Sequence, residues 1–370
     1  MKILVNASNL KRGGGLQVGD SVCRELYKYR QHSFVVVLPS SMNATFQAIE
    51  KYPNIKVFTY DLRRNWKTFL FGRDEYLDAL VDTYSVESVL TFFGPSVWIP
   101  KCTHLCGFAR AQIILPESPY YQQMDKISLF KTRIKYGVRE WAFKRCSNNF
   151  YTENPFATKR LSKKWPDKKI FTVTNYYNQV FDQPSNWKEK KIKNFEGITI
   201  LTVTALYAHK NLGIAADTAR LLKQCYPDFR FRFILTISRE EYRVNLDKVE
   251  ENFVFVGKVD ISECPSLYKQ SDIVFQPTLL ECFTASYPEA MRMERPIVTT
   301  DLEFAKVLCG NAAEYYTATD PKACAEAIYK VATNNVLRQR LVNNGNDQLK
   351  LFDNYIQRVE KLIRLQEIIN

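Results

Sequence analysis

The stretch from Ser271 to Glu303 constrains the fold of this chain more than any other part of the sequence. Its apolar runs are too short for helices and predict two buried strands, with a loop and a helix between them. These four elements are expected at residues 273–275, 278–285, 286–294 and 296–300. In an open α/β sheet, ligands bind where such a helix begins, at the carboxyl end of the first strand. A helix N-terminus there favours an anion, usually phosphate.

Two carboxylates, Glu281 and Glu289, bracket the loop with seven residues between them. Glu289 has two interpretations: it completes a capping box with Ser286 as N-cap, or it faces a ligand. Glu281 is either a solvated loop carboxylate or a second ligand contact. A carboxylate accepts hydrogen bonds from hydroxyl groups and can hold a vicinal diol with both oxygens. A phosphate-favouring helix end between two such acceptors indicates a nucleotide-sugar site.

The segment from Glu281 to Ala290, ECFTASYPEA, resembles the E-x7-E motif of retaining family-4 glycosyltransferases, the glycosyl transferases group 1. The resemblance covers most of the C-terminal half and is weaker in the N-terminal half. It implies the GT-B fold, in which two Rossmann-like βαβ domains face each other across a cleft. Two positions depart from the motif. Thr284 stands where the family usually has glycine and Cys282 where it has a small residue, so both are expected to crowd the donor sugar.

Composition limits the remaining possibilities. With 370 residues, 46% hydrophobic and 25% charged, the chain is expected to form two globular domains. No apolar run reaches the roughly 18 residues that span a bilayer, and the N-terminus does not resemble a signal peptide. Nine scattered cysteines and three histidines support neither a zinc site nor a disulfide framework, which favours a reducing cytosol. The net charge of +13 favours anionic partners.

Alternating strand and helix patterns predict an α/β fold with parallel sheets. Further strands are expected at residues 2–5, 33–39, 55–60, 86–92, 102–108, 148–153, 170–175, 198–203, 229–237, 253–256 and 313–316. The polar and irregular composition of residues 179–197 predicts a linker between two domains. It separates an N-terminal domain, residues 1–178, from a C-terminal domain, residues 198–354. Residues 346–369 are expected to form one final helix, and the resemblance implies that its part from about 355 to 370 packs back on the first domain.

The loop of residues 6–15 ends in three glycines and leads into a helix. It matches neither GxGxxG nor a P-loop, so it reads either as a flexible turn or as a place of close ligand approach. The resemblance implies that Gly14 and Gly15 close over the donor phosphates.

The expected helix of residues 125–145 combines an apolar stripe with seven cations. One interpretation is a helix whose apolar stripe faces the core and whose basic face is solvated. The other is a helix that lies on a membrane surface.

In the second domain, Lys210 follows the strand of residues 198–203, and the resemblance implies that it contacts the donor diphosphate. The family's partner arginine is replaced by Ala205, for which His209 is a candidate substitute. The resemblance also implies donor contacts from residues in three further groups: Gly257 and Val259, the motif residues Phe283, Thr284 and Ala285, and Glu289 at the ribose.

On the N-terminal side, many relatives carry a histidine at the end of the strand of residues 102–108. Here His104 lies two or three residues too early, inside the strand, and receives no catalytic role. Phe108 and Arg110 are the candidates for acceptor contacts.

These observations predict an enzyme that moves a sugar from a nucleoside-diphosphate sugar, of UDP or GDP type, to a glycan or lipid-linked glycan acceptor. The resemblance implies retention at the anomeric carbon, with Glu281 and Lys210 as catalytic residues. No metal cofactor is expected, since no Asp-x-Asp motif is present, and no nucleic-acid partner is expected. The expected location is cytoplasmic, with peripheral contact to an anionic membrane. Two alternatives stay open: a GT-B nucleotide-sugar epimerase, and a non-enzymatic basic binder of membrane or nucleic acid.

Overall fold

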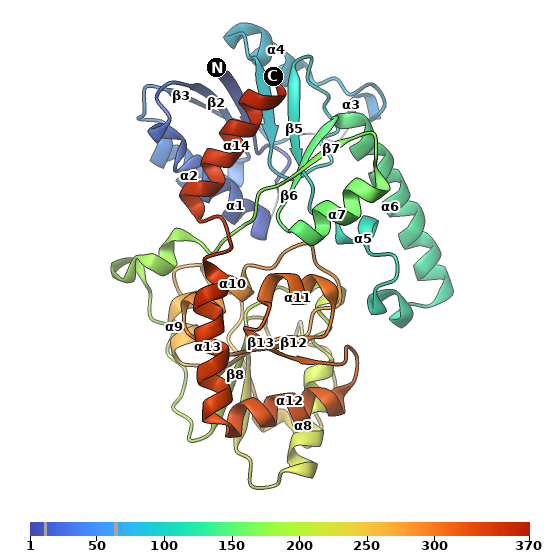
Figure 1. Ribbon diagram of the computed structural model, residues 1–370, viewed down its shortest axis with the longest axis vertical. Coiled ribbons are helices and arrows are strands. Elements are labelled where there is room, and N and C mark those ends of the chain that lie inside the picture. The colour runs from blue at the N-terminus through green and yellow to red at the C-terminus, as the bar shows by residue number, and fades with distance from the viewer. Residues whose placement is uncertain (11–12, 63–65) are drawn as a thin grey trace. The chain divides into compact units, whose positions relative to one another are not determined.

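The computed structural model describes residues 1–10, 13–62 and 66–370, which form two compact units (Figure 1). Unit 1 contains Met1–Pro116, Asp125–Asn175 and Asp353–Asn370, and unit 2 contains Glu117–Met124 and Tyr176–Phe352. Residues 11–12 of the predicted glycine loop lie outside the described residues. Each unit is a parallel-sheet α/β fold, as predicted.

The sheet of unit 1 has seven strands in the order β3-β2-β1-β4-β5-β6-β7, and all neighbours are parallel. Strands β1 and β4 are adjacent although the chain leaves β1 toward β2, so the order of the strands reverses between them. Loops at the carboxyl ends of such a pair form the usual binding crevice of this type of sheet. The strands are β1 (Lys2–Asn6), β2 (Ser33–Leu38), β3 (Ile55–Thr59), β4 (Ser88–Thr91), β5 (Thr103–Gly107), β6 (Asn149–Thr152) and β7 (Lys169–Thr172).

Side chains of these strands alternate between two apolar layers because successive residues point to opposite faces of a sheet. One layer joins Ile3 and Val5 to the helices α1 and α14, and the other joins Leu4 to α4. The helices of unit 1 are α1 (Gly14–Cys23), α2 (Asn43–Ile49), α3 (Trp66–Phe71), α4 (Glu75–Tyr84), α5 (Ala111–Ile114), α6 (Lys126–Cys146), α7 (Pro155–Lys164) and α14 (Tyr355–Ile369).

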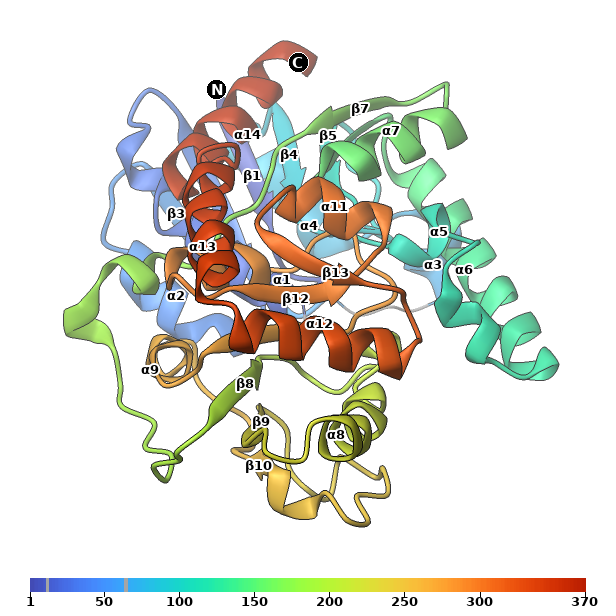
Figure 2. The same ribbon diagram turned by 60° about the horizontal axis from the view of Figure 1, so that its bottom comes forward.

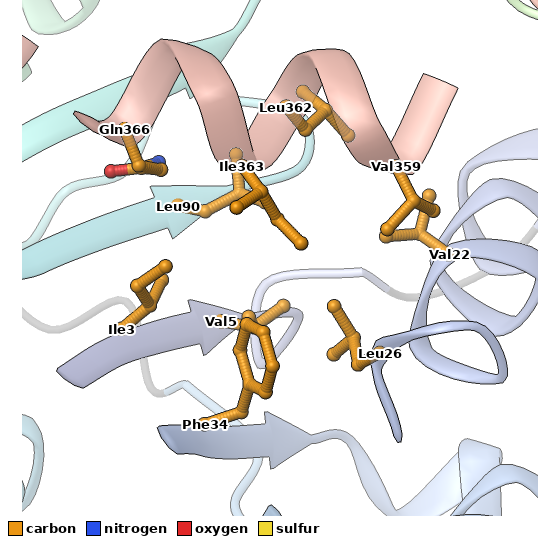
Figure 3. Close-up of a pocket in the computed structure, with 10 residues that line it drawn as sticks. All are labelled: Ile3, Val5, Val22, Leu26, Phe34, Leu90, Val359, Leu362, Ile363 and Gln366. Atoms are coloured by element: carbon orange, nitrogen blue, oxygen red, sulfur yellow. The ribbon is translucent and has the colours of Figure 1, made fainter. Parts of the chain in front are cut away.

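The C-terminal helix α14 completes the core of unit 1. Figure 3 shows Ile363 directed toward side chains of β1, β2 and β4 and Val359 beside Val22 of α1, and Leu362 belongs to the same core. A cavity of about 10 Å³ remains between them, which is too small for a ligand larger than water. The last helix of the chain is therefore a structural part of the first unit.

The sheet of unit 2 has six parallel strands in the order β10-β9-β8-β11-β12-β13. Here β8 and β11 are the adjacent pair at which the strand order reverses. Figure 2 shows α8 and α12 near β8, β9 and β12, and their apolar side chains form one core layer of the unit. The strands are β8 (Ile198–Thr202), β9 (Phe231–Leu235), β10 (Phe253–Phe255), β11 (Ile273–Gln276), β12 (Ile297–Thr300) and β13 (Ala313–Tyr316). The helices are α8 (Ile214–Cys225), α9 (Cys264–Lys269), α10 (Ser286–Arg292), α11 (Glu303–Cys309), α12 (Pro321–Thr333) and α13 (Asn335–Leu349).

Three boundaries differ from the sequence predictions. The last two helices break at residues 350–354 and not near residue 344, because Asn354 and Gln357 form a capping box that starts α14. Residues 179–197 are not a free linker. They belong to unit 2, where Lys188 and Lys190 donate main-chain hydrogen bonds to Ser262 and Ser266. The segment Glu117–Met124 also belongs to unit 2.

In the described part of the chain, no helix is long and apolar enough to cross a bilayer.

Candidate functional site

The loops that follow β8 and β11 are joined at the carboxyl end of the unit 2 sheet. The amide of Leu279 donates a 2.8 Å hydrogen bond to the carbonyl of His209. The hydroxyl of Ser286, the first residue of α10, donates to the carbonyl of Val203 at 3.2 Å. Because β8 and β11 are the pair at which the strand order reverses, these contacts place the two loops at the predicted binding edge.

Glu281 is fixed by three neighbours from these loops. Its Oε1 lies 2.5 Å from Nζ of Lys210 and accepts a 3.0 Å hydrogen bond from the hydroxyl of Thr278. The same oxygen lies 3.7 Å from Nε2 of His209. The carboxylate and the ammonium group are only 12% and 14% exposed, so Glu281 is not the solvated loop residue of the simpler interpretation. Sequence reasoning named both residues, and the structure brings them together.

His209 lies between two tyrosine rings. Tyr207 stacks on its imidazole at 5.6 Å between ring centroids, and Tyr120 meets it edge-on at 6.1 Å. Burial lowers the pKa of His209; Lys210 lowers it further and Glu281 opposes the change. The imidazole is therefore neutral at pH 7 and does not replace the missing arginine as a second cation.

The segment Glu117–Met124 contributes the ring of Tyr120 and two further contacts to these loops. The hydroxyl of Ser118 donates a 2.6 Å hydrogen bond to the carbonyl of Leu279. The side-chain amide of Gln123 donates to Oδ1 of Asn211 at 3.3 Å. A stretch from the first half of the sequence thus holds the loop that carries His209 and Lys210.

Glu289 does not form the capping box that was one of its two interpretations. The N-cap of α10 is Ala285 and has no side-chain cap, so Ser286 is already inside the helix. The carboxylate of Glu289 is buried and accepts a 2.8 Å hydrogen bond from the hydroxyl of Tyr268. Burial raises its pKa to about 7, against the opposing effects of the Tyr268 hydrogen bond and of Lys210. Lys210 therefore pairs with Glu281 and also acts by its charge on Glu289.

The other predicted donor contacts also lie on loops of unit 2. Gly257 follows β10 with a φ of 68°, a conformation that favours glycine, and a side chain there would meet only open space. Val259 and Phe283 are half-buried, and Ala285 is the N-cap of α10. The side chains of Thr284 and Cys282, the two departures from the family motif, are buried, at 6% and 5% exposure.

The candidates in unit 1 have different surroundings. Phe108 is fully buried against Phe143 and Trp165, so its side chain belongs to the core and offers no surface to an acceptor. Gly14 and Gly15 begin α1, and a side chain at Gly14 would meet nothing within 4 Å. Their predicted role at the donor phosphates stays a prediction. Arg110 is the N-cap of the short helix α5 and lines a pocket of unit 1.

His104 lies inside β5, as expected. Its Nδ1 is 2.8 Å from the carbonyl of Cys146, and its Nε2 is 2.9 Å from the hydroxyl of Thr91. Burial lowers its pKa to about 4. This neutral, fully hydrogen-bonded imidazole has a structural role.

Sequence reasoning missed three residues of the site: Tyr268, Thr278 and Tyr120. Tyr268 lies 21 positions before the carboxylate it contacts, and Tyr120 lies 89 positions before His209. No local pattern marks such pairs. Thr278 could have been predicted from the sequence, since a hydroxyl three residues before Glu281 in a short loop is a common local hydrogen-bond partner.

Comparison with known proteins finds similarity over the part of the chain that contains these loops. Residues 197–334 match the model of the family described as glycosyl transferases group 1. Over 147 residues the chain is 26% identical to a phosphatidyl-myo-inositol mannosyltransferase of Mycobacterium leprae, a match that covers 39% of each protein. It is 23% identical over 286 residues to the O-antigen chain mannosyltransferase RfbU of Salmonella typhimurium, covering 74% of this chain and 72% of that one.

Among solved structures, sucrose-phosphate synthase of Thermosynechococcus elongatus resembles the chain with a TM-score of 0.71. The sequence identity is 13%, and the superposition covers 99% of this chain and 98% of that one. At this identity the likeness concerns the fold. The chain therefore has the GT-B fold, and its residues 197–334 match the glycosyl transferases group 1 family.

Proposed function

We propose that the chain is a glycosyltransferase that moves a sugar from a nucleoside-diphosphate sugar to a glycan or lipid-linked glycan. The observation that carries the proposal is the convergence of Lys210, Glu281 and Glu289 at the carboxyl ends of β8 and β11, inside the stretch that matches the family. Two similar proteins are named mannosyltransferases, so a mannosyl donor is the first to test.

In this proposal unit 2 binds the donor. Lys210 is the cation nearest the diphosphate, and it stabilises the negative charge that develops as the bond between the anomeric carbon and the phosphate oxygen breaks. Glu281 accepts hydrogen bonds from hydroxyls of the donor sugar, and Glu289 accepts them from the ribose diol. The main chain can be approached closely at Gly257, because a side chain there would meet nothing within 4 Å, and the same holds at Gly14 of unit 1.

We propose transfer with retention. The electron pair of the breaking bond leaves with the nucleoside diphosphate, and the acceptor hydroxyl bonds to the same face of the sugar. The acceptor proton passes to the departing phosphate oxygen, so no protein nucleophile is required. Unit 1 supplies the acceptor contacts, with Arg110 as the candidate.

We also propose that transfer needs no metal ion. Among the described residues, no three His, Cys, Asp or Glu side chains gather in a way that would hold one. Transfer measured after chelator treatment should match the untreated rate. Loss of transfer that only magnesium or manganese restores would contradict this part of the proposal.

The epimerase alternative finds less support. It requires histidine and carboxylate chemistry in the first unit, where His32 and His104 are both buried. A binder of nucleic acid or membrane without enzymatic activity would leave the arrangement of Lys210, Glu281 and Glu289 without a role. We propose a cytoplasmic enzyme, because none of its nine cysteines forms a disulfide bond in the structure.

A thermal-shift screen tests the proposal, since a ligand that binds the native state raises the melting temperature. Nucleoside-diphosphate sugars of the UDP and GDP type should be compared with the free sugars and with nucleosides. We expect stabilisation by at least one nucleotide sugar at concentrations where free sugars have no effect. A screen in which no nucleotide sugar stabilises the protein, followed by salt-sensitive binding of nucleic acid, would favour the binding-protein alternative.

A further inference from the structure

Large apolar side chains are exposed along two helices of unit 1. They are Trp66, Leu70 and Phe71 of α3 and Ile127, Phe130, Ile134, Val138 and Trp141 of α6, each between 46% and 68% exposed. We call these eight residues the α3–α6 patch. Contacts join the two helices, because the rings of Phe69 and Trp141 lie 5.4 Å apart and Arg145 donates a 2.7 Å hydrogen bond to the carbonyl of Leu70. Figure 1 shows α6 along one flank of unit 1 with α3 beside it.

The apolar stripe of α6 is not the side of the helix that packs on unit 1. Its five residues recur every three or four positions and so share one face. The half-buried Leu129, Thr132 and Tyr136 and the buried Phe143 recur in the same way on the opposite face. The sequence interpretation in which the apolar stripe faces the core is therefore wrong.

Cations flank the exposed stripe on both sides. The helix carries seven lysines and arginines but a single acid, Glu140. Helical spacing places Lys131, Lys135 and Arg139 along one side of the stripe. It places Lys126, Arg133 and Lys144 along the other, while Arg145 covers the ring of Trp141 at 4.7 Å. Long basic side chains beside apolar ones are suited to the boundary between acyl chains and anionic headgroups.

A pocket of about 330 Å³ opens beside the patch. Its cations are Arg110, Lys135 and Arg139, and its apolar lining is Phe69, Pro95, Val97, Val138 and Ala142. No acidic residue is among these eight lining residues. Val138 belongs to both the pocket and the patch, so the two surfaces are continuous. A ligand that combines a phosphate with an apolar tail matches this lining.

We propose that the α3–α6 patch docks on an anionic lipid bilayer and that the adjoining pocket receives the phosphate of a lipid headgroup. The apolar residues enter the interface between headgroups and acyl chains, and the flanking cations attract the anionic leaflet. Charge favours this partner over a second copy of the chain, because two copies of the patch would bring like-charged helices together.

Vesicle flotation of the full chain without nucleotide sugar tests the proposal independently of donor binding. We expect binding to vesicles of phosphatidylglycerol and phosphatidylcholine and little binding to phosphatidylcholine alone. Phe130→Ser with Ile134→Ser should weaken binding to the anionic vesicles roughly tenfold or more, since two exposed apolar side chains no longer enter the bilayer. The matched control, Val336→Ser with Leu351→Ser, changes two exposed apolar residues of unit 2 and should bind like wild type.

A second pair of variants tests the pocket. Lys135→Ala with Arg139→Ala removes two pocket cations, whereas Lys126→Ala with Lys144→Ala removes two cations on the other side of the same stripe. We expect the pocket pair to weaken binding at least fivefold more than the flanking pair, and inorganic phosphate not to release the wild type. Equal losses for the two pairs would overturn the headgroup pocket. Wild type that ignores anionic vesicles, or that self-associates through Phe130, would overturn the docking surface.

Discussion

At the scale of single residues, the main feature of the site is that Lys210 neutralises Glu281 but makes no ion pair with Glu289. The ammonium group of Lys210 pairs with Glu281, burial raises the pKa of Glu289 although the charge of Lys210 lowers it, and the nearby His209 is kept neutral by burial. Glu281 forms an ion pair with Lys210, whereas Glu289 accepts a hydrogen bond from the hydroxyl of Tyr268. Substitutions of Glu281 and of Glu289 should therefore have different effects.

Glu289 should make stability and donor affinity depend on pH in opposite directions. Its pKa is about 7 in the native protein and 4.5 when unfolded, so the native state holds more protons between these values. Relative to Glu289→Gln, the free energy of unfolding should fall as pH rises from about 4.5 to 7, by on the order of 3 kcal/mol. Donor affinity should rise over the same range, because the ionised carboxylate is the better acceptor for ribose hydroxyls.

Urea unfolding and donor titration at several pH values measure both effects. The variant should show neither dependence, and a 2′,3′-dideoxy nucleotide should bind wild type and variant alike. If the dideoxy ligand still distinguishes the two proteins, Glu289 does not contact the ribose.

Glu281→Gln should separate binding from transfer. Removing the carboxylate charge releases Lys210 from its ion pair, so affinity for a nucleoside diphosphate without sugar should stay the same or rise. Transfer should fall strongly, because the donor-sugar hydroxyls lose their acceptor. Glu314→Gln is a matched control, since it breaks another lysine pair of unit 2, with Lys330 at 2.6 Å, and should change neither quantity. Near-normal transfer by Glu281→Gln would remove the donor-site assignment.

At the scale of elements, the contribution of a residue of α14 to stability should depend on whether its side chain packs against the strands of unit 1. Leu362 is buried against the strands of unit 1, whereas Ile368 on the same helix is 64% exposed. Leu362→Ala should destabilise unit 1 by about 2–5 kcal/mol, and Ile368→Ala should stay within about 0.5 kcal/mol of wild type. The denaturant midpoint of the unit 1 transition measures this difference. Similar midpoints for the two variants would contradict the role of α14 in the core.

All strands of the described structure were predictable, because most are short runs rich in apolar, aromatic or β-branched residues between turn residues. Helix termini were less predictable. Ser286 and Glu289 have the spacing of a capping box, yet the hydroxyl donates to Val203 and the carboxylate accepts from Tyr268. Tertiary partners outweighed the local motif. The stripe of α6 was visible in the sequence, but its direction was not, since an apolar face has the same spacing whether it meets a core or a bilayer.

At the scale of the whole molecule, the sequence predicted two α/β units with parallel sheets, and the structure has two such units. The sequence could not place Glu117–Met124 in unit 2, because that assignment depends on contacts of Ser118, Tyr120 and Gln123 with loops far along the chain. The candidate site was predictable where one motif contains the residues, as for Glu281 and Glu289. It was not predictable where distant segments supply the partners.

The most direct measurement of the central claim is the affinity of Lys210→Ala for a nucleoside diphosphate and for the matching nucleoside. Loss of one charge-assisted contact is worth roughly 1.5–3 kcal/mol, so diphosphate affinity should fall about tenfold to hundredfold while nucleoside affinity stays unchanged. Lys223→Ala, which removes an exposed lysine of unit 2, should bind both ligands like wild type. Equal losses for diphosphate and nucleoside, or a diphosphate affinity that does not change, would contradict a donor site at the carboxyl ends of β8 and β11.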